Sequence, residues 1–184
     1  MKKALILVDI QNDYFKGGRH ELVNPEQAAS QASNILHVFR ARGWNIFHIR
    51  HINSNPEASF FKVDTDGITF CEDVCPLEGE EVITKHRPDS FQGTNLKLKL
   101  TENNIEEVII CGMMTHMCID TTVRTASRYG YSVTLIEDAC ATRDLIWREQ
   151  IISAEEVQNA YFAALNGTFA TVQKADLWIK EQSN

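Results

Sequence analysis

The sequence lacks a long apolar run, an excess of positive charge and a recognisable secretion signal. No stretch approaches the roughly 20 apolar residues that a membrane-spanning helix needs, so we expect no membrane partner. The 184 residues carry a formal net charge of -7, which disfavours nucleic acid and anionic membrane surfaces as partners. The apolar start "ALILV" is too short for the core of a signal peptide, and Asp9 interrupts it. This start therefore predicts a first strand.

The sequence also lacks an even set of cysteines and a zinc-finger spacing. Its five cysteines are Cys71, Cys75, Cys111, Cys118 and Cys140. With no secretion signal, an odd number favours reduced thiols and a cytoplasmic location. Cys71 and Cys75 are spaced C-x3-C, but no second Cys/His pair follows at metal-ligand spacing. We therefore expect no metal at these cysteines.

Repeats, low-complexity segments and linkers are absent, and the length favours a single domain over residues 1–184. A domain of this size buries about 70% of the surface that its unfolded chain exposes. Apolar runs alternate with helical patterns along the chain. The predicted strands are residues 4–8, 45–50, 80–85, 106–112, 131–139 and 169–173, and the predicted helices are 25–43, 94–103, 121–130, 153–167 and a last one after 173. This alternation predicts an α/β fold with one doubly wound, mainly parallel six-stranded sheet and helices on both faces.

Residues 51–80 form the longest stretch without a regular pattern. The stretch contains Pro56, Gly67, Pro76 and Gly79 and lies between the second and third predicted strands. A plain connection is rarely so long, so we expect a lid over a site or an interface with another subunit.

Reactive residue types follow three of the predicted strands. In parallel sheets, sites form at the carboxyl ends of strands near the switch in strand order. This rule points to five places, which are Asp9, Arg50 to Asn53, Lys85, the 112–118 turn and Asp138. Cys118 lies where a strand meets a helix, and a helix start favours negative charge and offers free N–H groups. Together Asp9, Lys85 and Cys118 would supply a base, a cation and a nucleophile. Taken singly, Asp9 could be a strand terminus, Lys85 a solvated lysine and Cys118 a core thiol.

Four motifs carry a family resemblance. They are "LILVDIQNDYF", "KHRPDSFQGTNL", "IICGMMTHMCIDTTVRTASRYGY" and "IEDACAT", and they run in order from residue 5 to residue 142. In these motifs the sequence resembles the isochorismatase-like cysteine hydrolases. That superfamily also contains nicotinamidases, N-carbamoylsarcosine amidohydrolases and ureidoacrylate amidohydrolases. The resemblance implies a Rossmann-like three-layer fold and a hydrolase that cleaves a C–N bond of a small amide or carbamoyl-type substrate.

The resemblance also implies roles for individual residues. Asp9 would accept the proton of the nucleophile, Lys85 would hold the ion pair and polarise the substrate, and Cys118 would attack to form a thioester. A cis peptide would lie between Met113 and Met114. The N–H groups of Met114 and Cys118 would then form an oxyanion hole.

Two departures narrow the expected activity. Nicotinamidases have Asp-x-His after the second strand for a divalent metal, where this chain has "RHINSN" with His51 and Asn53. His48 and His51 are three apart on a strand, so their side chains should face opposite ways. We therefore expect no metal and no other cofactor, and we keep nicotinamidase or isochorismatase-type activity only as the alternative function. Isochorismatases proper lack the cysteine, so Cys118 argues against isochorismate. A thiol sensor or binding module on the same fold remains the alternative of another class.

The residues that could touch a substrate are less specific. The candidates are Tyr14, Phe15, His51, Phe60, Phe91, His116 and Trp147. Thr122 matches a threonine of the family and is expected to be structural. We expect a small-molecule substrate and a homo-oligomer, a dimer or higher, in which residues near Trp147 could come from a neighbouring subunit.

Overall fold

A computed structural model describes residues 1–55 and 57–182 of the chain. At its centre is a parallel six-stranded sheet with the order β3-β2-β1-β4-β5-β8. The strands are β1 Lys3–Val8, β2 Asn45–His51, β3 Glu81–Lys85, β4 Glu107–Met113, β5 Ser132–Ala141 and β8 Thr171–Gln173. All six predicted strands are therefore confirmed. The strand order reverses between β1 and β4, so the carboxyl ends of these two strands form the switch point.

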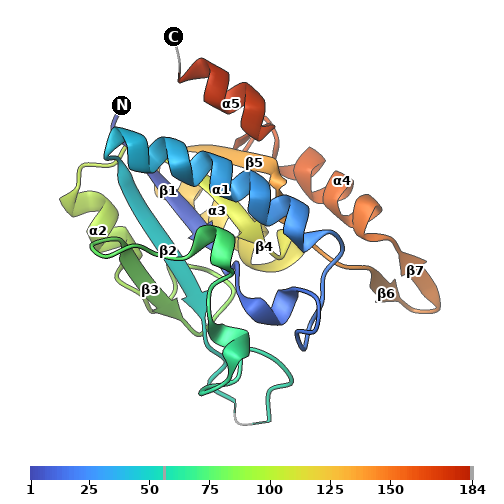
Figure 1. Ribbon diagram of the computed structural model, residues 1–184. Helices are drawn as coiled ribbons and strands as arrows, with labels where there is room; N and C mark the ends of the chain where they lie inside the picture. The colour runs from blue at the N-terminus through green and yellow to red at the C-terminus, as the bar shows by residue number, and fades with distance from the viewer. Residues whose placement is uncertain (56, 183–184) are drawn as a thin grey trace.

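Helices cover both faces of the sheet, as predicted (Figure 1). The helices α1 Pro25–Arg42 and α5 Ala175–Glu181 pack on one face, where Phe39 and Trp178 stack with ring centroids 5.5 Å apart. The other face buries residues of α2 Leu96–Glu102, α3 Asp120–Arg128 and α4 Ala154–Leu165. Among the described residues, no helix is both long and apolar enough to cross a bilayer.

The helix boundaries follow local capping chemistry. Pro25 opens α1, and Gly43 ends it in the left-handed conformation that glycine favours. Ser153 precedes α4 and forms a capping box with Glu156, as the spacing predicts. The helices are slightly shorter than predicted because capping residues lie outside the helical turns themselves.

Gly112 allows β4 to lie close to the end of β1. Its φ is +129°, and a Cβ at this position would stand 2.0 Å from the carbonyl oxygen of Val8. Only glycine fits such an approach without a backbone shift. The close approach brings Asp9 and the turn after β4 to the same edge of the sheet.

A short hairpin was not predicted. Strands β6 Leu145–Trp147 and β7 Gln150–Ile152 pair antiparallel outside the main sheet and stand off from the body of the fold (Figure 1). Strands of three residues are too short for a period-two pattern. The turn between them has Arg148 at a positive φ of 55° instead of the glycine or asparagine that marks most tight hairpins.

The long segment between β2 and β3 packs against the connection that follows β1. It contains two 3-10 turns, Asp66–Ile68 and Glu72–Val74. The Phe61 N–H donates to Asp13 Oδ2 at 2.6 Å. Gly67 lies so close to the Asp13 carboxylate that any side chain there would collide with it. The segment is therefore tied to the end of the sheet that carries Asp9, and its role as a lid or an interface stays a prediction.

Candidate active site

Three side chains meet at the switch point of the sheet. Asp9 directly follows β1, Lys85 is the last residue of β3, and Cys118 lies in the turn Thr115–Ile119 after β4. The Lys85 Nζ lies 2.7 Å from Asp9 Oδ2 and 3.2 Å from Cys118 Sγ. All three residues are buried, with exposed fractions of 0%, 1% and 3% for Asp9, Lys85 and Cys118. The structure thus brings together the base, the cation and the thiol that the sequence indicates.

The backbone around these residues is unusual in two places. Asp9 has φ 53°, a conformation that few residues other than glycine adopt and that is typical of functional sites. The Met113–Met114 peptide bond is cis, at the position that the resemblance indicates. One π-helical turn over Thr115–Ile119 then carries Cys118 into α3, so the cysteine lies between a strand and a helix as predicted.

Burial and mutual attraction set the charges in this group. Burial, with a further contribution from Asp9, raises the pKa of the Cys118 thiol, although Lys85 opposes the change. Burial also acts to raise the pKa of Asp9, but Lys85 and His51 outweigh it and the pKa is lowered. Burial acts to lower the pKa of Lys85, but Asp9 and Cys118 outweigh it and the pKa is raised. These directions favour a carboxylate, an ammonium and a neutral thiol. Burial therefore opposes the negative charge that the helix start favours on Cys118.

His51 is a fourth member of the group. It ends β2, and its Nδ1 lies 3.1 Å from Lys85 Nζ and 4.0 Å from Cys118 Sγ. His48 faces the other way, with its Nε2 2.8 Å from a carboxylate oxygen of Glu80. The prediction that the two histidines face opposite sides of the sheet is confirmed.

Gln11 was missed by the sequence analysis. Its buried side chain accepts a hydrogen bond from the His51 N–H at 2.7 Å and donates to the His51 carbonyl at 2.9 Å. It also donates to the Ile68 carbonyl at 3.1 Å, which ties the 51–80 segment to β2. The signal in the sequence was the amide two residues after Asp9 within a recognised motif. Nothing in the spacing indicates its partners, which lie 40 and 57 residues away.

The residues present do not fit a divalent metal. Among the described residues, the donor atoms of Asp9, His51 and Cys118 lie within 4.8 Å of one another, as metal ligands would. However, the Lys85 ammonium stands 2.7, 3.1 and 3.2 Å from these atoms, so a positive charge already occupies the centre of the group. Asn53 is no substitute for a carboxylate ligand, because it is neutral and its Oδ1 accepts a backbone N–H two residues on.

Aromatic rings lead away from the thiol toward the 51–80 segment. The Phe61 ring lies 5.6 Å from the His51 ring and 4.7 Å from the Tyr14 ring, measured between centroids. Phe60 packs on Phe61 at 5.0 Å and stacks on His20 at 4.2 Å. Of the predicted substrate contacts, His51, Tyr14 and Phe60 therefore belong to one continuous group beside the buried thiol.

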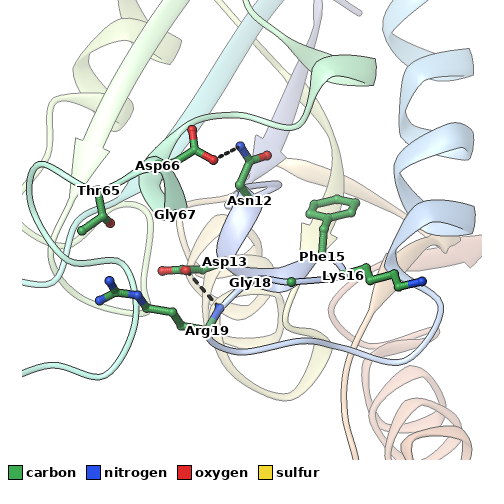
Figure 2. Close-up of a pocket in the computed structure, with 10 residues that line it drawn as sticks. Asn12, Asp13, Phe15, Lys16, Gly18, Arg19, Thr65, Asp66 and Gly67 are labelled. Atoms are coloured by element: carbon green, nitrogen blue, oxygen red, sulfur yellow. Dashed lines mark hydrogen bonds between the residues drawn. The ribbon is translucent and has the colours of Figure 1, made fainter.

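Phe15 lines a separate cavity of about 390 Å³ (Figure 2). Asp13 forms part of its wall and accepts a hydrogen bond from the Arg19 N–H at 3.1 Å. Across the cavity, Asn12 donates to Asp66 at 3.2 Å, which joins the β1–α1 connection to the 51–80 segment. Asp9, Lys85 and Cys118 do not line this cavity. Contact between Phe15 and a substrate stays a prediction.

Phe91 is buried in the same apolar cluster as Cys118. Its ring packs on the rings of Tyr129 and Tyr131, at 5.4 and 6.5 Å between centroids. Contact between Phe91 and a substrate stays a prediction. Thr122 donates to Ser90 Oγ and accepts from the Ser90 N–H, so its structural role is supported.

His116 contacts Thr142 and Tyr161, and Trp147 lies on the β6–β7 hairpin. The His116 Nδ1 is 2.6 Å from Thr142 Oγ1, and its ring packs 6.3 Å from Tyr161 of α4. Trp147 is 67% exposed on the β6–β7 hairpin, so it does not join the site of its own chain. Its contact with a neighbouring subunit's site stays a prediction.

Comparison with known proteins extends the resemblance over the whole fold. The Isochorismatase domain model matches residues 3–176. The chain is 48% identical to the uncharacterised isochorismatase family protein YddQ of Bacillus subtilis, over 98% of this chain and 100% of that protein. It superposes with a TM-score of 0.93 on the crystal structure of a proposed isochorismatase hydrolase from Oleispira antarctica, at 40% identity over 97% of this chain and 96% of that one.

More distant relatives include two amidases. N-carbamoylsarcosine amidase from Arthrobacter is 28% identical over 71% of this chain and 56% of that protein. Nicotinamidase 3 from Arabidopsis thaliana is 28% identical over 76% of this chain and 73% of that protein. The domain match and the identity to YddQ each cover nearly the full length. The chain therefore belongs to the isochorismatase family of hydrolases.

Proposed function

We propose that the protein is a cysteine-dependent amidohydrolase that cleaves a C–N bond of a small amide or carbamoyl-type substrate. The observation that carries this proposal is the contact of the buried Lys85 ammonium with Asp9 at 2.7 Å and with Cys118 at 3.2 Å. A base, a cation and a thiol within contact distance are what nucleophilic thiol chemistry needs. The two amidases among the relatives support the same reaction class.

In the first half of the reaction the thiol becomes an acyl carrier. Asp9 takes the proton of Cys118, and the sulfur attacks the substrate carbonyl carbon, whose oxygen gains the negative charge. The N–H groups of Met114 and Cys118 are the proposed donors to that oxygen, and one such donor is typically worth about 10²–10³-fold in rate. The C–N bond then breaks, and the amine leaves with the proton that Asp9 returns.

In the second half, water cleaves the thioester. Asp9, again a carboxylate, accepts a proton from the attacking water, and the oxygen bonds to the acyl carbon. The C–S bond breaks, the acid product leaves, and the proton returns to the sulfur of Cys118. Lys85 keeps its proton throughout and compensates whichever neighbour, Asp9 or Cys118, carries the negative charge. Its raised pKa fits this role.

Two neighbouring activities fit less well. Hydrolysis of a vinyl ether such as isochorismate needs no thiol nucleophile, whereas Cys118 here contacts the Lys85 ammonium directly. A nicotinamidase of the metal-dependent kind needs an acidic ligand near the thiol, where this chain has His51 and Asn53. A non-catalytic thiol sensor would not need the buried Asp9–Lys85 ion pair beside its cysteine.

A panel of small amides tests the proposal. Purified protein is mixed with primary amides, N-carbamoyl amino acids, ureido acids and nicotinamide, and the release of ammonia or amine is measured. We expect turnover of at least one class and none of isochorismate. Absence of turnover across the panel, with Cys118 also inert to thiol reagents in folded protein, would contradict the proposal.

We further expect the hydrolase to work without a metal, because the Lys85 ammonium occupies the centre of the group that a metal would need. Elemental analysis should find well under one metal per chain, and dialysis against a chelator should leave the rate unchanged. Stoichiometric zinc or iron, with activity lost on chelation and restored when the metal is added back, would overturn this expectation and reopen the nicotinamidase assignment.

We also propose that the chain acts as a homo-oligomer in a reducing compartment. The β6–β7 hairpin exposes three large apolar side chains, Ile146, Trp147 and Ile151, at 74%, 67% and 72%. A two-stranded hairpin is marginally stable alone in water, so packing against another subunit would stabilise it. Sedimentation of the purified protein as a monomer at micromolar concentration would contradict the oligomer.

The proposal of a reducing compartment rests on the cysteines. All five are free thiols, which is the state that the cytoplasm maintains.

A further inference from the structure

The Lys85 ammonium has four potential acceptors around it. Asp9 Oδ2 lies at 2.7 Å, His51 Nδ1 at 3.1 Å, the Arg87 carbonyl oxygen at 3.1 Å and Cys118 Sγ at 3.2 Å. An ammonium carries three donors and accepts nothing. The contact with His51 is therefore a hydrogen bond from Lys85 only if Nδ1 carries no proton. In that arrangement the proton of the neutral ring is on Nε2.

We propose that His51 is a positioning residue, a neutral acceptor that holds the Lys85 ammonium between Asp9 and Cys118. The inference rests on the proposed function and adds a residue to its catalytic group. Cys118 is 4.0 Å from the His51 Nδ1, and Asp9 is 3.7 Å from it. Both distances exceed that of an ordinary hydrogen bond, so Lys85 is the partner of this nitrogen.

The fold fixes the ring for this task. Gln11 binds both the N–H and the carbonyl of His51, at 2.7 and 2.9 Å. Phe61 packs against the ring with its centroid 5.6 Å away. These two hydrogen bonds fix the backbone of His51 at the end of β2, and the ring that it carries has its Nδ1 3.1 Å from the ammonium.

The proposal requires an Nδ1 without a proton. A proton on Nδ1 would place two donors face to face across 3.1 Å, and Lys85 could no longer be held by His51. The groups that face His51 are Asp9 after β1, Lys85 of β3 and Cys118 of the turn before α3. Of these three, Lys85 is the nearest to Nδ1 and is the one that can donate to it.

The ring tautomer can be measured without any substrate. Nitrogen-15 correlation spectra of the histidine rings should show His51 with a bare Nδ1 and a proton on Nε2 near pH 7.5, assigned by its loss in His51→Asn. In Lys85→Met, Nδ1 loses its donor and this tautomer preference should weaken. A protonated Nδ1 in the wild type would mean that His51 donates to Asp9, and the proposal would be wrong.

Kinetics with the best amide of the panel give the second readout. His51→Ala should lower kcat on the order of 10²-fold, as misplacement of a catalytic group does, with KM changed little. His51→Asn, which can offer an amide oxygen near the Nδ1 position, should recover at least tenfold of that loss, and His51→Gln serves if His51→Asn does not fold. The matched control His37→Asn, at an exposed position on α1, should keep the wild-type kcat.

Unchanged kcat in His51→Ala would overturn the proposal. Equal losses in folded His51→Ala, His51→Asn and His51→Gln would overturn it as well, because they would require the imidazole itself rather than an acceptor. If no amide is hydrolysed, the proposed function fails, and the spectra still decide whether Lys85 donates to His51.

Discussion

Cys118→Ala should abolish turnover while leaving the protein folded. The sulfur is the only atom of the residue that the reaction uses, and loss of a nucleophile costs on the order of 10³-fold or more in kcat. The buried thiol is replaced by a slightly smaller apolar group, so the melting temperature should change by a few degrees at most. The measurement is kcat on the best amide, with thermal unfolding followed on the same samples.

Cys140→Ala is the matched control for this loss. Cys140 is also buried, at 5% exposed, and donates a weak hydrogen bond to the Ile136 carbonyl at 3.3 Å. It lies on the same face of the sheet as Cys118 but does not touch Lys85 or Asp9 in any described contact. Its variant should retain most of the activity. If Cys118→Ala kept more than a few per cent of the wild-type rate, the covalent mechanism would be wrong.

Asp9→Asn should lower kcat by about 10²–10⁴-fold, the usual cost of losing a general base. The change keeps the shape of the side chain and removes the charge that accepts the Cys118 proton. It also leaves the Lys85 ammonium without its closest partner in a site where both side chains are fully buried. Breaking such a pair from one side typically costs about 3–5 kcal/mol, so the melting temperature should fall as well.

The loss of rate and the loss of stability can be separated. The double variant Asp9→Asn, Lys85→Met removes both charges, so it should recover stability relative to Asp9→Asn and remain inactive. Asp176→Asn, at an exposed aspartate of α5, is the matched control and should behave as the wild type. Full activity in Asp9→Asn would remove Asp9 from the mechanism.

The sequence was sufficient to predict the six-stranded sheet with its helices and three residues of the candidate site. Apolar runs between capped helices predicted the six strands, and the rule that sites form at carboxyl strand ends placed Asp9, Lys85 and Cys118 together before any contact was seen. That rule works because the carboxyl ends of parallel strands all lie at the same edge of the sheet. The residues at their ends must then be neighbours whatever the side-chain details.

The remainder depends on contacts that sequence spacing does not encode. Gln11 binds His51, which lies 40 residues further along the chain. His51 in turn contacts Lys85, a further 34 residues along. Burial raises the pKa of the Cys118 thiol, whereas the local turn alone favours a charge. Phe91 lies within a family motif, but its ring contacts two tyrosines that only the tertiary packing brings to it.

The acyl-enzyme itself is the most direct test of the account. Wild-type protein is mixed with the best amide and quenched in acid at times shorter than one turnover. The mass of the intact protein is then measured by mass spectrometry. The account predicts a mass gain equal to the substrate minus its amine, located on the peptide that contains Cys118 and absent from Cys118→Ala. Product formation with no adduct at any quench time, or an adduct on another residue, would contradict it.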